Sequence, residues 1–282
     1  MKIKGSTNIV GLIGHPVEHS FSPPMHNAAF DSLNMDYAYV AFDVNPNDLK
    51  SAIEGAKALN IRGFNVTIPH KIEVMQHLDE LDEVAGLIGA VNTIDFKNLK
   101  GYNTDGIGAI RAIEEVTSVK DKNVVVAGAG GASRAISFYL AKFGASSITI
   151  LNRNVNKAQE LAGDVLKSDL IGDVGSDSIS GIDGYLKDAD ILVDTTPLGM
   201  DPHIDDEPIA KANAMHENLV VFDAVYNPNE TVLLKEAIKA GAKPVYGIKM
   251  LLYQGAESFK IWTGRDAPID VMQKALNEYL GR

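Results

Sequence analysis

The chain has 282 residues, 45% of them hydrophobic, which is enough for one large core or two moderate ones. Its 26 Lys and Arg against 37 Asp and Glu give a net charge of -11, and without a dense basic run this argues against a nucleic-acid partner. Cysteine is absent, which excludes disulfides and thiolate metal sites. Neither a signal-peptide pattern nor an apolar run of about 20 residues is present, so we expect a cytoplasmic protein with no membrane partner.

The first part of the chain alternates strand and helix signals. The predicted strands are 9–14, 37–44, 61–67 and 91–95. The predicted helices are 24–33, 46–59, 78–88 and 105–116. Such alternation predicts an open α/β sheet, whose binding site lies beyond the carboxyl ends of the strands.

Polar residues gather at these strand ends. Ser20 and Ser22 either hydrogen-bond a carboxylate near a helix N-terminus or simply cap that helix. Lys71 follows Thr67 near a predicted helix start, the end that disfavours a cation, so it is either an acid/base or an ordinary surface lysine. Asp105 is an N-cap or the partner of that lysine. A Lys–Asp pair in a cleft suits the oxidation of an alcohol, because the hydroxyl proton must leave as the hydride does.

A zinc-peptidase pattern is also present and we reject it. His15, Glu18 and His19 match H-x-x-E-H, which requires a helix, but Pro16 follows the first histidine and a turn rich in Ser and Pro comes next. We therefore predict no metal site.

The middle of the chain carries a glycine loop. An apolar strand at 124–127 runs into Gly128-Ala-Gly130-Gly, and the loop opens an alanine-rich helix at 132–143. Such a loop lets backbone N–H groups approach a pyrophosphate at the positive end of the helix, although it also occurs in nucleotide-free α/β proteins. A second buried strand at 148–151 completes the expected context and favours the dinucleotide-binding interpretation.

The residues after that second strand indicate which dinucleotide binds. Asn152 and Arg153 offer an amide and a guanidinium where an NAD site offers a carboxylate to the ribose. A guanidinium suits bidentate contact with a 2′-phosphate. The pattern therefore predicts NADP.

The remaining elements complete a two-domain α/β organisation. Further strands are predicted at 191–194, 219–222 and 244–246, a loop or short helix at 172–184, and helices at 250–262 and 270–279. We expect a substrate-binding domain at 1–117, completed by the C-terminal helices at 248–282, and a Rossmann dinucleotide-binding domain at 118–247.

Several motifs together resemble one family over essentially the whole chain. They are Ile13-Gly14-His15-Pro16, His19-Ser20-Phe21-Ser22-Pro23, the run from Gly63 to Lys71, Gly89-Ala90-Val91-Asn92-Thr93, Asn103-Thr104-Asp105-Gly106, and the glycine loop with Asn152-Arg153. The chain resembles the shikimate dehydrogenases, NADP-dependent enzymes of aromatic amino-acid (chorismate) biosynthesis. The resemblance implies reversible reduction of 3-dehydroshikimate to shikimate by hydride transfer from NADPH.

The resemblance also implies roles for individual residues. For the substrate, Ser20, Ser22 and Tyr226 would bind the carboxylate, Thr67, Asn92, Asp105 and Gln254 would hold ring hydroxyls, and Lys71 would be the acid/base oriented by Asp105. For the cofactor, the pyrophosphate would be cradled by Gly128, Ala129, Gly130, Gly131 and Ala132. The 2′-phosphate region would be served by Asn152, Arg153, Asn154 and Lys157. Thr195 would lie near the adenosine half or the ribose, and the backbone of Ala224 and Gly247 would lie near the nicotinamide. Lys249 departs from the family, since many relatives have glycine there.

Two other functions stay open at this stage. A quinate/shikimate dehydrogenase of broader specificity would use nearly the same pocket residues. A catalytically silent NADP-binding sensor is disfavoured because both Lys71 and Asp105 are present. The expected assembly is a monomer or a homodimer.

Overall fold

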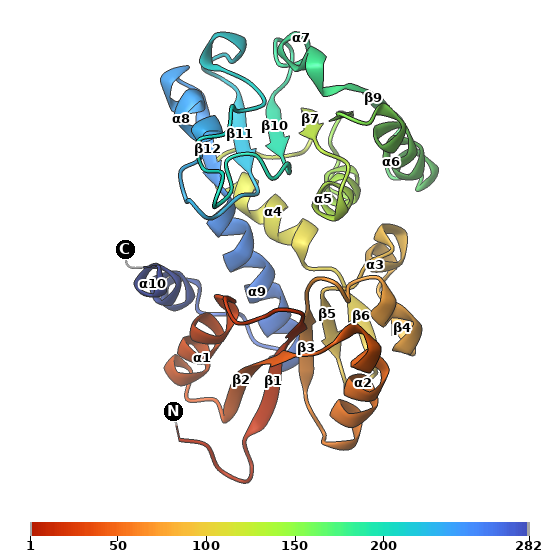
Figure 1. Cartoon of the computed structure of the whole chain (residues 1–282), viewed down its shortest axis with the longest axis vertical. Coiled ribbons are helices and arrows are strands. Elements are labelled where there is room, and N and C mark those ends of the chain that lie inside the picture. The colour runs from red at the N-terminus through yellow and green to blue at the C-terminus, as the bar shows by residue number, and fades with distance from the viewer. Residues whose placement is uncertain (1, 281–282) are drawn as a thin grey trace. The chain divides into compact units, whose positions relative to one another are not determined.

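The computed structural model describes residues 2–280, which divide into two compact units. Unit 1 holds the described residues up to Thr104 and from Gln254 onward, and unit 2 is Asp105–Tyr253. Each unit is built on its own β-sheet with helices packed against it (Figure 1). This confirms the predicted α/β fold class.

The sheet of unit 1 is mixed. Its strands are β1 (Asn8–Gly14), β2 (Tyr37–Asp43), β3 (Gly63–Val66), β4 (Glu80–Leu81), β5 (Thr93–Asp95) and β6 (Lys100–Tyr102). They lie in the order β2-β1-β3-β5-β6-β4. Strand β1 is parallel to β2 and β3, whereas β5 is antiparallel to β3 and β6. The carboxyl ends of β1, β2 and β3 therefore share one edge, where the site is expected.

Helices cover both faces of this sheet. They are α1 (Ser22–Ser32), α2 (Leu49–Ala58), α3 (Glu83–Ile88), α10 (Ile269–Tyr279), the second part of α9 (Gly247–Thr263), and the 3-10 turns η1 (Pro46–Asp48) and η2 (Glu73–His77). Leu49 and Ile53 of α2 pack with Phe64 in one core. In the second core, Phe30 of α1 stacks on Phe259 of α9, with ring centroids 5.1 Å apart.

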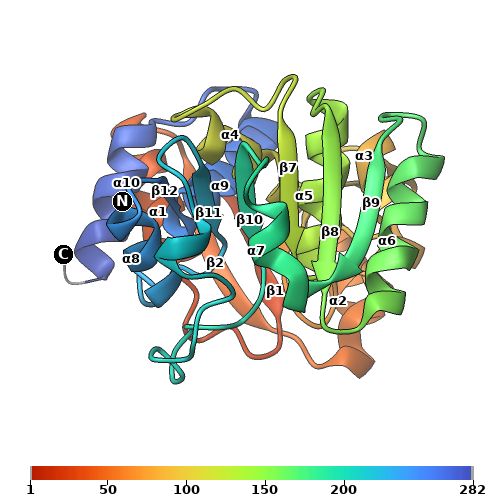
Figure 2. The same cartoon turned by 90° about the horizontal axis from the view of Figure 1, so that it is seen from above.

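Unit 2 is a doubly wound parallel sheet. Its strands are β7 (Asn123–Ala127), β8 (Ser147–Asn152), β9 (Val174–Ser178), β10 (Ile191–Asp194), β11 (Val220–Asp223) and β12 (Lys243–Tyr246), in the order β12-β11-β10-β7-β8-β9. Its helices are α4 (Asp105–Glu114), α5 (Gly131–Lys142), α6 (Val155–Lys167), α7 (Ile182–Tyr185), α8 (Val232–Lys239), the start of α9, and the 3-10 turns η3 (Ile179–Gly181) and η4 (Ala212–Ala214). Figure 2 shows α7 and α8 on one side of the sheet and α4 and α5 on the other. Counted along the chain, the strand order is 3-2-1-4-5-6, which defines a Rossmann dinucleotide-binding fold.

The unit boundaries differ from the predicted ones at 117/118 and 247/248. Helix α4 belongs to unit 2 because Gly106 packs directly on α5: a Cβ at Gly106 would lie 2.5 Å from the carbonyl oxygen of Ala135. At the other boundary the chain passes from unit 2 to unit 1 inside α9, between Tyr253 and Gln254. A helix that continues through a boundary leaves no loop signal in the sequence.

Three local predictions need correction. The segment 172–184 contains strand β9 in addition to the short helix α7. The predicted helix 78–88 is strand β4 followed by α3, which starts after Asp82 caps it by accepting from the N–H of Val84. The predicted helix 46–59 starts as the 3-10 turn η1 before it becomes α2.

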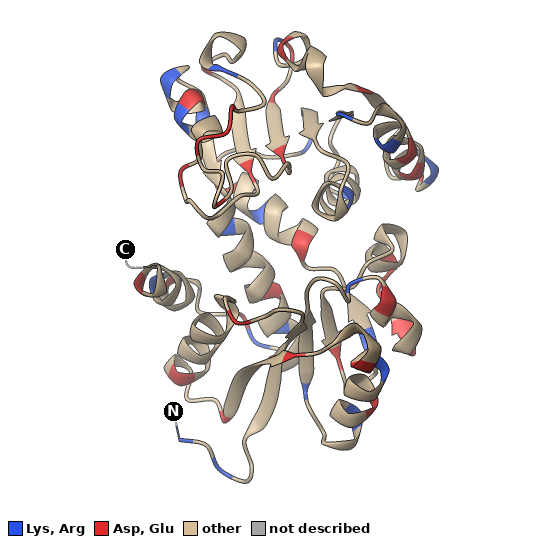
Figure 3. Cartoon of the chain, in the orientation of Figure 1, with Lys and Arg blue, Asp and Glu red and all other residues tan. Residues whose placement is uncertain are grey.

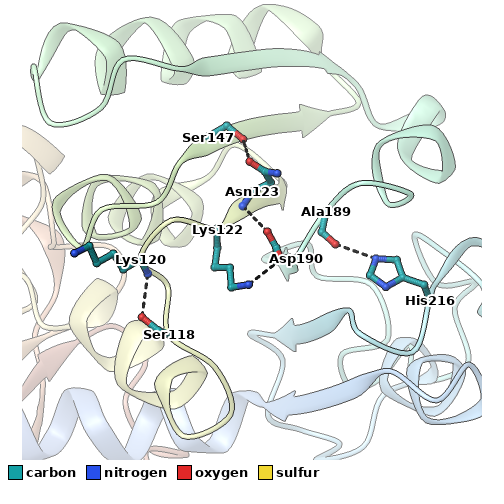
Figure 4. Close-up of polar contacts among 8 residues, drawn as sticks. All are labelled: Ser118, Lys120, Lys122, Asn123, Ser147, Ala189, Asp190 and His216. Atoms are coloured by element: carbon teal, nitrogen blue, oxygen red, sulfur yellow. Dashed lines mark hydrogen bonds and ion pairs between the residues drawn. The ribbon is translucent and has the colours of Figure 1, made fainter.

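A cluster of polar contacts ties together the amino ends of the strands of unit 2 (Figure 4). The carboxylate of Asp190 accepts from the Asn123 N–H at 2.9 Å and from Nζ of Lys122 at 3.0 Å, while Ser147 donates to the Asn123 side chain at 2.9 Å. Burial raises the pKa of Asp190, but the bonds from Asn123 and Lys122 outweigh it and the net shift is downward. These bonds hold the starts of β7 and β8 next to the residue that precedes β10.

Charge is spread over the molecule. Figure 3 shows Lys and Arg interspersed with Asp and Glu on the helices of both units. Among residues 2–280, no helix is both long enough and apolar enough to cross a bilayer.

Candidate active site

The glycine loop of unit 2 has the geometry that close backbone approach requires. Gly128 has a φ of +107°, and a Cβ there would lie 2.4 Å from Oγ1 of Thr195. Side chains at Gly130 or Gly131 would meet no atom within 4 Å, so the space in front of them is open. Helix α5 begins at Gly131 without a side-chain cap, which leaves its first N–H groups for an anion.

A small buried residue packs against the glycine loop. Ser133, at the third position of the glycine motif, is buried and hydrogen-bonds with the hydroxyl of Thr195. Thr195 in turn donates to the carbonyl oxygen of Ala127 at 2.8 Å. These contacts fix the end of β10 against the end of β7, at the point where the strand order reverses and ligands bind in such sheets.

A cavity of about 400 Å³ opens beside this loop. The predicted residues that line it are Gly128, Ala129, Gly130, Asn152, Arg153 and Thr195. The residues that the sequence reasoning missed are Ile179, Thr196, Pro197, Leu198 and Ile209. The segment Thr196–Leu198 directly follows Thr195 at the end of a predicted strand, so its position could have indicated a place in the site. Ile179 and Ile209 carry no such signal in the sequence. An open glycine cradle, a helix N-terminus and a guanidinium on one cavity fit a phosphorylated dinucleotide.

Four other predicted cofactor residues do not line this cavity. Gly131 and Ala132 form the first turn of α5. Asn154 caps α6 by accepting from the Asn156 N–H at 3.1 Å, and Lys157 is exposed in the first turn of that helix. Asn154 therefore has a structural role of its own.

The last pair of predicted cofactor residues meets at the end of β11. A Cβ at Gly247 would lie 2.6 Å from the carbonyl oxygen of Ala224, so only glycine permits this approach. The unusual Lys249, two residues on, forms an ion pair with Glu115 at 3.3 Å, and Tyr253 donates a hydrogen bond to the same carboxylate. Lys249, the residue that departs from the family pattern, is thus held by a contact within unit 2.

Two buried carboxylates end neighbouring strands and were not anticipated. Asp194 and Asp223 are paired in register on β10 and β11. Asp194 accepts from the Thr196 N–H at 2.8 Å, and Asp223 accepts from Thr231 at 2.6 Å and the Val225 N–H at 2.9 Å. Burial raises the pKa of Asp194 and, to about 6, that of Asp223. Both carboxyl groups shape the loops that follow their strands.

In unit 1 the two predicted serines lie at the start of α1. The Oγ of Ser20 accepts from the Ser22 N–H at 3.2 Å. Phe21, at the N-cap position, makes no side-chain cap. Ser22 is buried, and its side chain hydrogen-bonds with the phenol of Tyr39, which partly offsets the burial that raises the Tyr39 pKa.

Thr67 and Lys71 follow β3. The Thr67 N–H donates to the carbonyl oxygen of Ile13 at 2.9 Å, and a Cβ at Gly14 would lie 2.3 Å from Cγ2 of Thr67. Lys71 is half-buried, and its carbonyl oxygen accepts from the Val91 N–H at 2.8 Å. It lies shortly before the 3-10 helix η2, so the predicted helix start is present as a 3-10 turn.

The remaining substrate residues divide between the units. Asn92 and Gln254 are buried in unit 1. Asp105, the half-buried first residue of α4, and the exposed Tyr226 belong to unit 2. Unit 1 contains the other predicted substrate residues, which are Ser20, Ser22, Thr67, Lys71, Asn92 and Gln254.

The segment with the zinc-like pattern is irregular. It joins β1 to α1, and Nδ1 of His15 lies 2.6 Å from Oδ1 of Asp43. Within residues 2–280, no group of three or more His, Asp or Glu is placed to hold a metal ion.

Fold and cavity place the chain in the class of two-unit α/β proteins with a Rossmann dinucleotide-binding unit. Family models match as the shikimate dehydrogenase substrate binding domain (residues 12–94), shikimate / quinate 5-dehydrogenase (111–236) and the shikimate 5′-dehydrogenase C-terminal domain (247–276). The chain is 72% identical over 278 residues to the shikimate dehydrogenase (NADP(+)) of Methanobrevibacter smithii, covering 99% of both chains. It belongs to the shikimate dehydrogenase family.

Solved structures agree over nearly the full length. A shikimate dehydrogenase in complex with NADP+ superposes with a TM-score of 0.92 at 52% identity, covering 100% of this chain and 98% of the other. The shikimate 5-dehydrogenase of Listeria monocytogenes, in complex with shikimate and NAD, gives 0.93 at 34% identity, covering 98% of each. Relatives of this fold thus occur with either dinucleotide, so the residues of the cavity must decide the preference of this chain.

Proposed function

We propose that the protein is an NADP-dependent shikimate dehydrogenase, which interconverts shikimate and 3-dehydroshikimate at the ring 3-hydroxyl. The observation that carries the proposal is the 72% identity to such an enzyme over 99% of both chains. The cavity beside the glycine loop supports NADP independently, because Arg153 lines it together with the loop. The cavity alone would suit many dehydrogenases, so the substrate rests on the full-length similarity.

The predicted substrate residues, most of which belong to unit 1, match the chemistry of this substrate. Ser20 and Ser22 at the start of α1 offer hydroxyls to the carboxylate of shikimate, with Tyr226 as the third contact. The buried side chains of Asn92 and Gln254, with Thr67 and Asp105, hold the ring hydroxyls.

Lys71 is the group that exchanges the proton. Oxidation breaks the C3–H bond and the O–H bond of the same carbinol, and a C=O double bond forms. Bound NADP+ supplies the hydride acceptor. Lys71 takes the hydroxyl proton as the base, and Asp105 orients Lys71. In the reverse direction the ammonium returns the proton to the carbonyl oxygen.

The cofactor would be bound mainly by backbone groups and one guanidinium. The N–H groups from Gly128 to Ala132 would face the pyrophosphate, and Arg153 would contact the 2′-phosphate, with Asn152, Asn154 and Lys157 beside it. Thr195 would serve the adenosine half or the ribose, and the backbone of Ala224 and Gly247, which approach each other closely, would lie near the nicotinamide.

The test is a steady-state assay of the purified protein that follows the absorbance of the reduced cofactor. Shikimate and quinate are each assayed with NADP and with NAD. We expect the highest kcat/KM with shikimate and NADP. Equal values for quinate would show the broader specificity that one family description names, and no turnover of either acid would refute the proposal.

A further inference from the structure

A buried chain of hydrogen bonds runs behind the substrate residues of unit 1. It connects Tyr39, Asn65, Ser258, Thr104 and Asn92, which come from distant parts of the sequence and are all buried. The phenol of Tyr39 donates to Oδ1 of Asn65 at 2.8 Å, and Nδ2 of Asn65 donates to Oγ of Ser258 at 2.9 Å. Every one of these residues lies in unit 1.

Ser258 is the point where the segments meet. Its hydroxyl oxygen is 2.8 Å from Oγ1 of Thr93 and 3.2 Å from Oγ1 of Thr104. It donates to the carbonyl oxygen of Gln254, one helical turn earlier in α9, at 3.0 Å. A single fully buried hydroxyl thus joins α9 to β3, to β5 and to the segment that leads into α4.

Two backbone groups fix the direction of the hydrogen bonds. The N–H of Thr104 can only donate, and it donates to Oδ1 of Asn92 at 2.7 Å. This sets which end of the Asn92 amide is the acceptor and leaves its NH₂ group as the donor end. The carbonyl oxygen of Gln254 can only accept, so the hydroxyl hydrogen of Ser258 is committed to it and the Ser258 oxygen accepts from Asn65.

We propose that Ser258 is a positioning residue for substrate binding, which holds the carboxamide of Asn92 in the orientation that receives a ring hydroxyl. The proposal rests on the proposed function, because Asn92 is assigned to the substrate there. Ser258 acts through Asn92 and does not itself contact the substrate. Because the Ser258 hydrogen goes to the backbone carbonyl of Gln254, the Thr104 hydroxyl donates to the Ser258 oxygen at 3.2 Å, and Nδ2 of Asn92 donates to the Thr104 oxygen at 3.0 Å.

Loss of the hydroxyl removes the nearest acceptor of the Asn65 amide and leaves it Oγ1 of Thr93 at 3.0 Å and the carbonyl oxygen of Asn92 at 3.3 Å. It also removes the acceptor of the Thr104 hydroxyl, so the hydrogen bonds around Asn92 rearrange. Ring hydroxyls are held alike in the ground state and the transition state, so the loss acts on KM more than on kcat. We expect Ser258→Ala to raise the KM for shikimate about five- to thirty-fold, with kcat and the KM for NADP near the wild-type values.

A matched pair of variants separates the hydroxyl from packing. Ser258→Thr and Ser258→Val have the same shape and differ by a hydroxyl against a methyl group, so both fill the site equally. We expect Thr to restore the low KM for shikimate and Val to behave as Ala does. Ser137→Ala is the control, because Ser137 is also fully buried but its hydroxyl has no hydrogen-bond partner in residues 2–280; its KM should equal the wild-type value.

The outcomes are distinguishable. A wild-type enzyme that turns over shikimate while Ser258→Ala keeps the wild-type KM overturns this inference alone. Equal kinetics for Ser258→Thr and Ser258→Val, or an equal rise in the KM for NADP, also overturns it, since each indicates a general packing defect. A wild-type protein without turnover refutes the proposed function, and the inference falls with it.

Discussion

A buried histidine makes the stability of unit 1 sensitive to acid. His26 in α1 is fully buried, and its ring stacks on that of Tyr39 with centroids 4.5 Å apart. Neither ring nitrogen has a hydrogen-bond partner within residues 2–280. Burial without a partner disfavours the charged form and lowers the pKa of His26 from 6.5 to about 3.

The direction and size of the effect follow from these two values. The unfolded chain protonates His26 below pH 6.5, whereas the folded chain keeps it neutral down to about pH 3. The unfolded state therefore binds more protons in this window, and the free energy of unfolding falls as the pH falls. Relative to about pH 7.5 the loss is about 2 kcal/mol at about pH 5, and it approaches about 5 kcal/mol at the acid end of the window.

The test compares the wild type with His26→Phe, which keeps an aromatic ring and removes the titration. Urea unfolding is followed at about pH 7.5 and about pH 5 by the fluorescence of Trp262. This is the single tryptophan of the chain, and its ring lies 5.5 Å from that of His26, so it reports on unit 1. Between the two pH values, the wild type should lose about 2 kcal/mol more than the variant. Equal losses in the two proteins would show that His26 is not the group that makes unit 1 sensitive to acid.

Three further substitutions test the site. Lys71→Ala should lower kcat about 10²- to 10⁴-fold with little change in the KM for shikimate, measured by initial rates; near-normal turnover would contradict its role as acid/base. Arg153→Ser should raise the KM for NADP roughly 10- to 100-fold and leave that for NAD nearly unchanged; an equal effect on both cofactors would remove it from the 2′-phosphate. Gly128→Ala should lower the free energy of unfolding by about 1–3 kcal/mol, because the new Cβ would lie 2.4 Å from Oγ1 of Thr195 at a φ of +107°. The matched control is Gly163→Ala in α6, where the new Cβ would meet no atom within 4 Å and should stabilise the helix by about 0.5–1 kcal/mol.

The fold was largely predictable because most strands are short apolar runs bounded by turn residues. Strand β9 was missed for a physical reason: Val174–Ser178 is an edge strand that reads Val-Gly-Ser-Asp-Ser, and its pairing with β8 uses backbone groups, which leave no pattern of side chains. The unit boundary inside α9 was likewise invisible, because the helix signal continues through it.

The site was predictable where chemistry limits the choice of residue. The glycine loop, Asn152 and Arg153 line one cavity as the motif required. Ile179 and Ile209 line the same cavity but look in sequence like any other apolar residue. Ser258 belongs to no motif either, because its proposed role depends on contacts with Asn65, Thr93 and Thr104, which are distant from it in the sequence.

We expect the protein to oxidise shikimate with NADP. The most direct measurement is the initial rate of reduced-cofactor formation with shikimate, compared between NADP and NAD at equal concentrations. We expect clear turnover with a higher kcat/KM for NADP than for NAD. A preference for NAD would contradict the assignment of Arg153, and the absence of shikimate turnover with either cofactor would contradict the function itself.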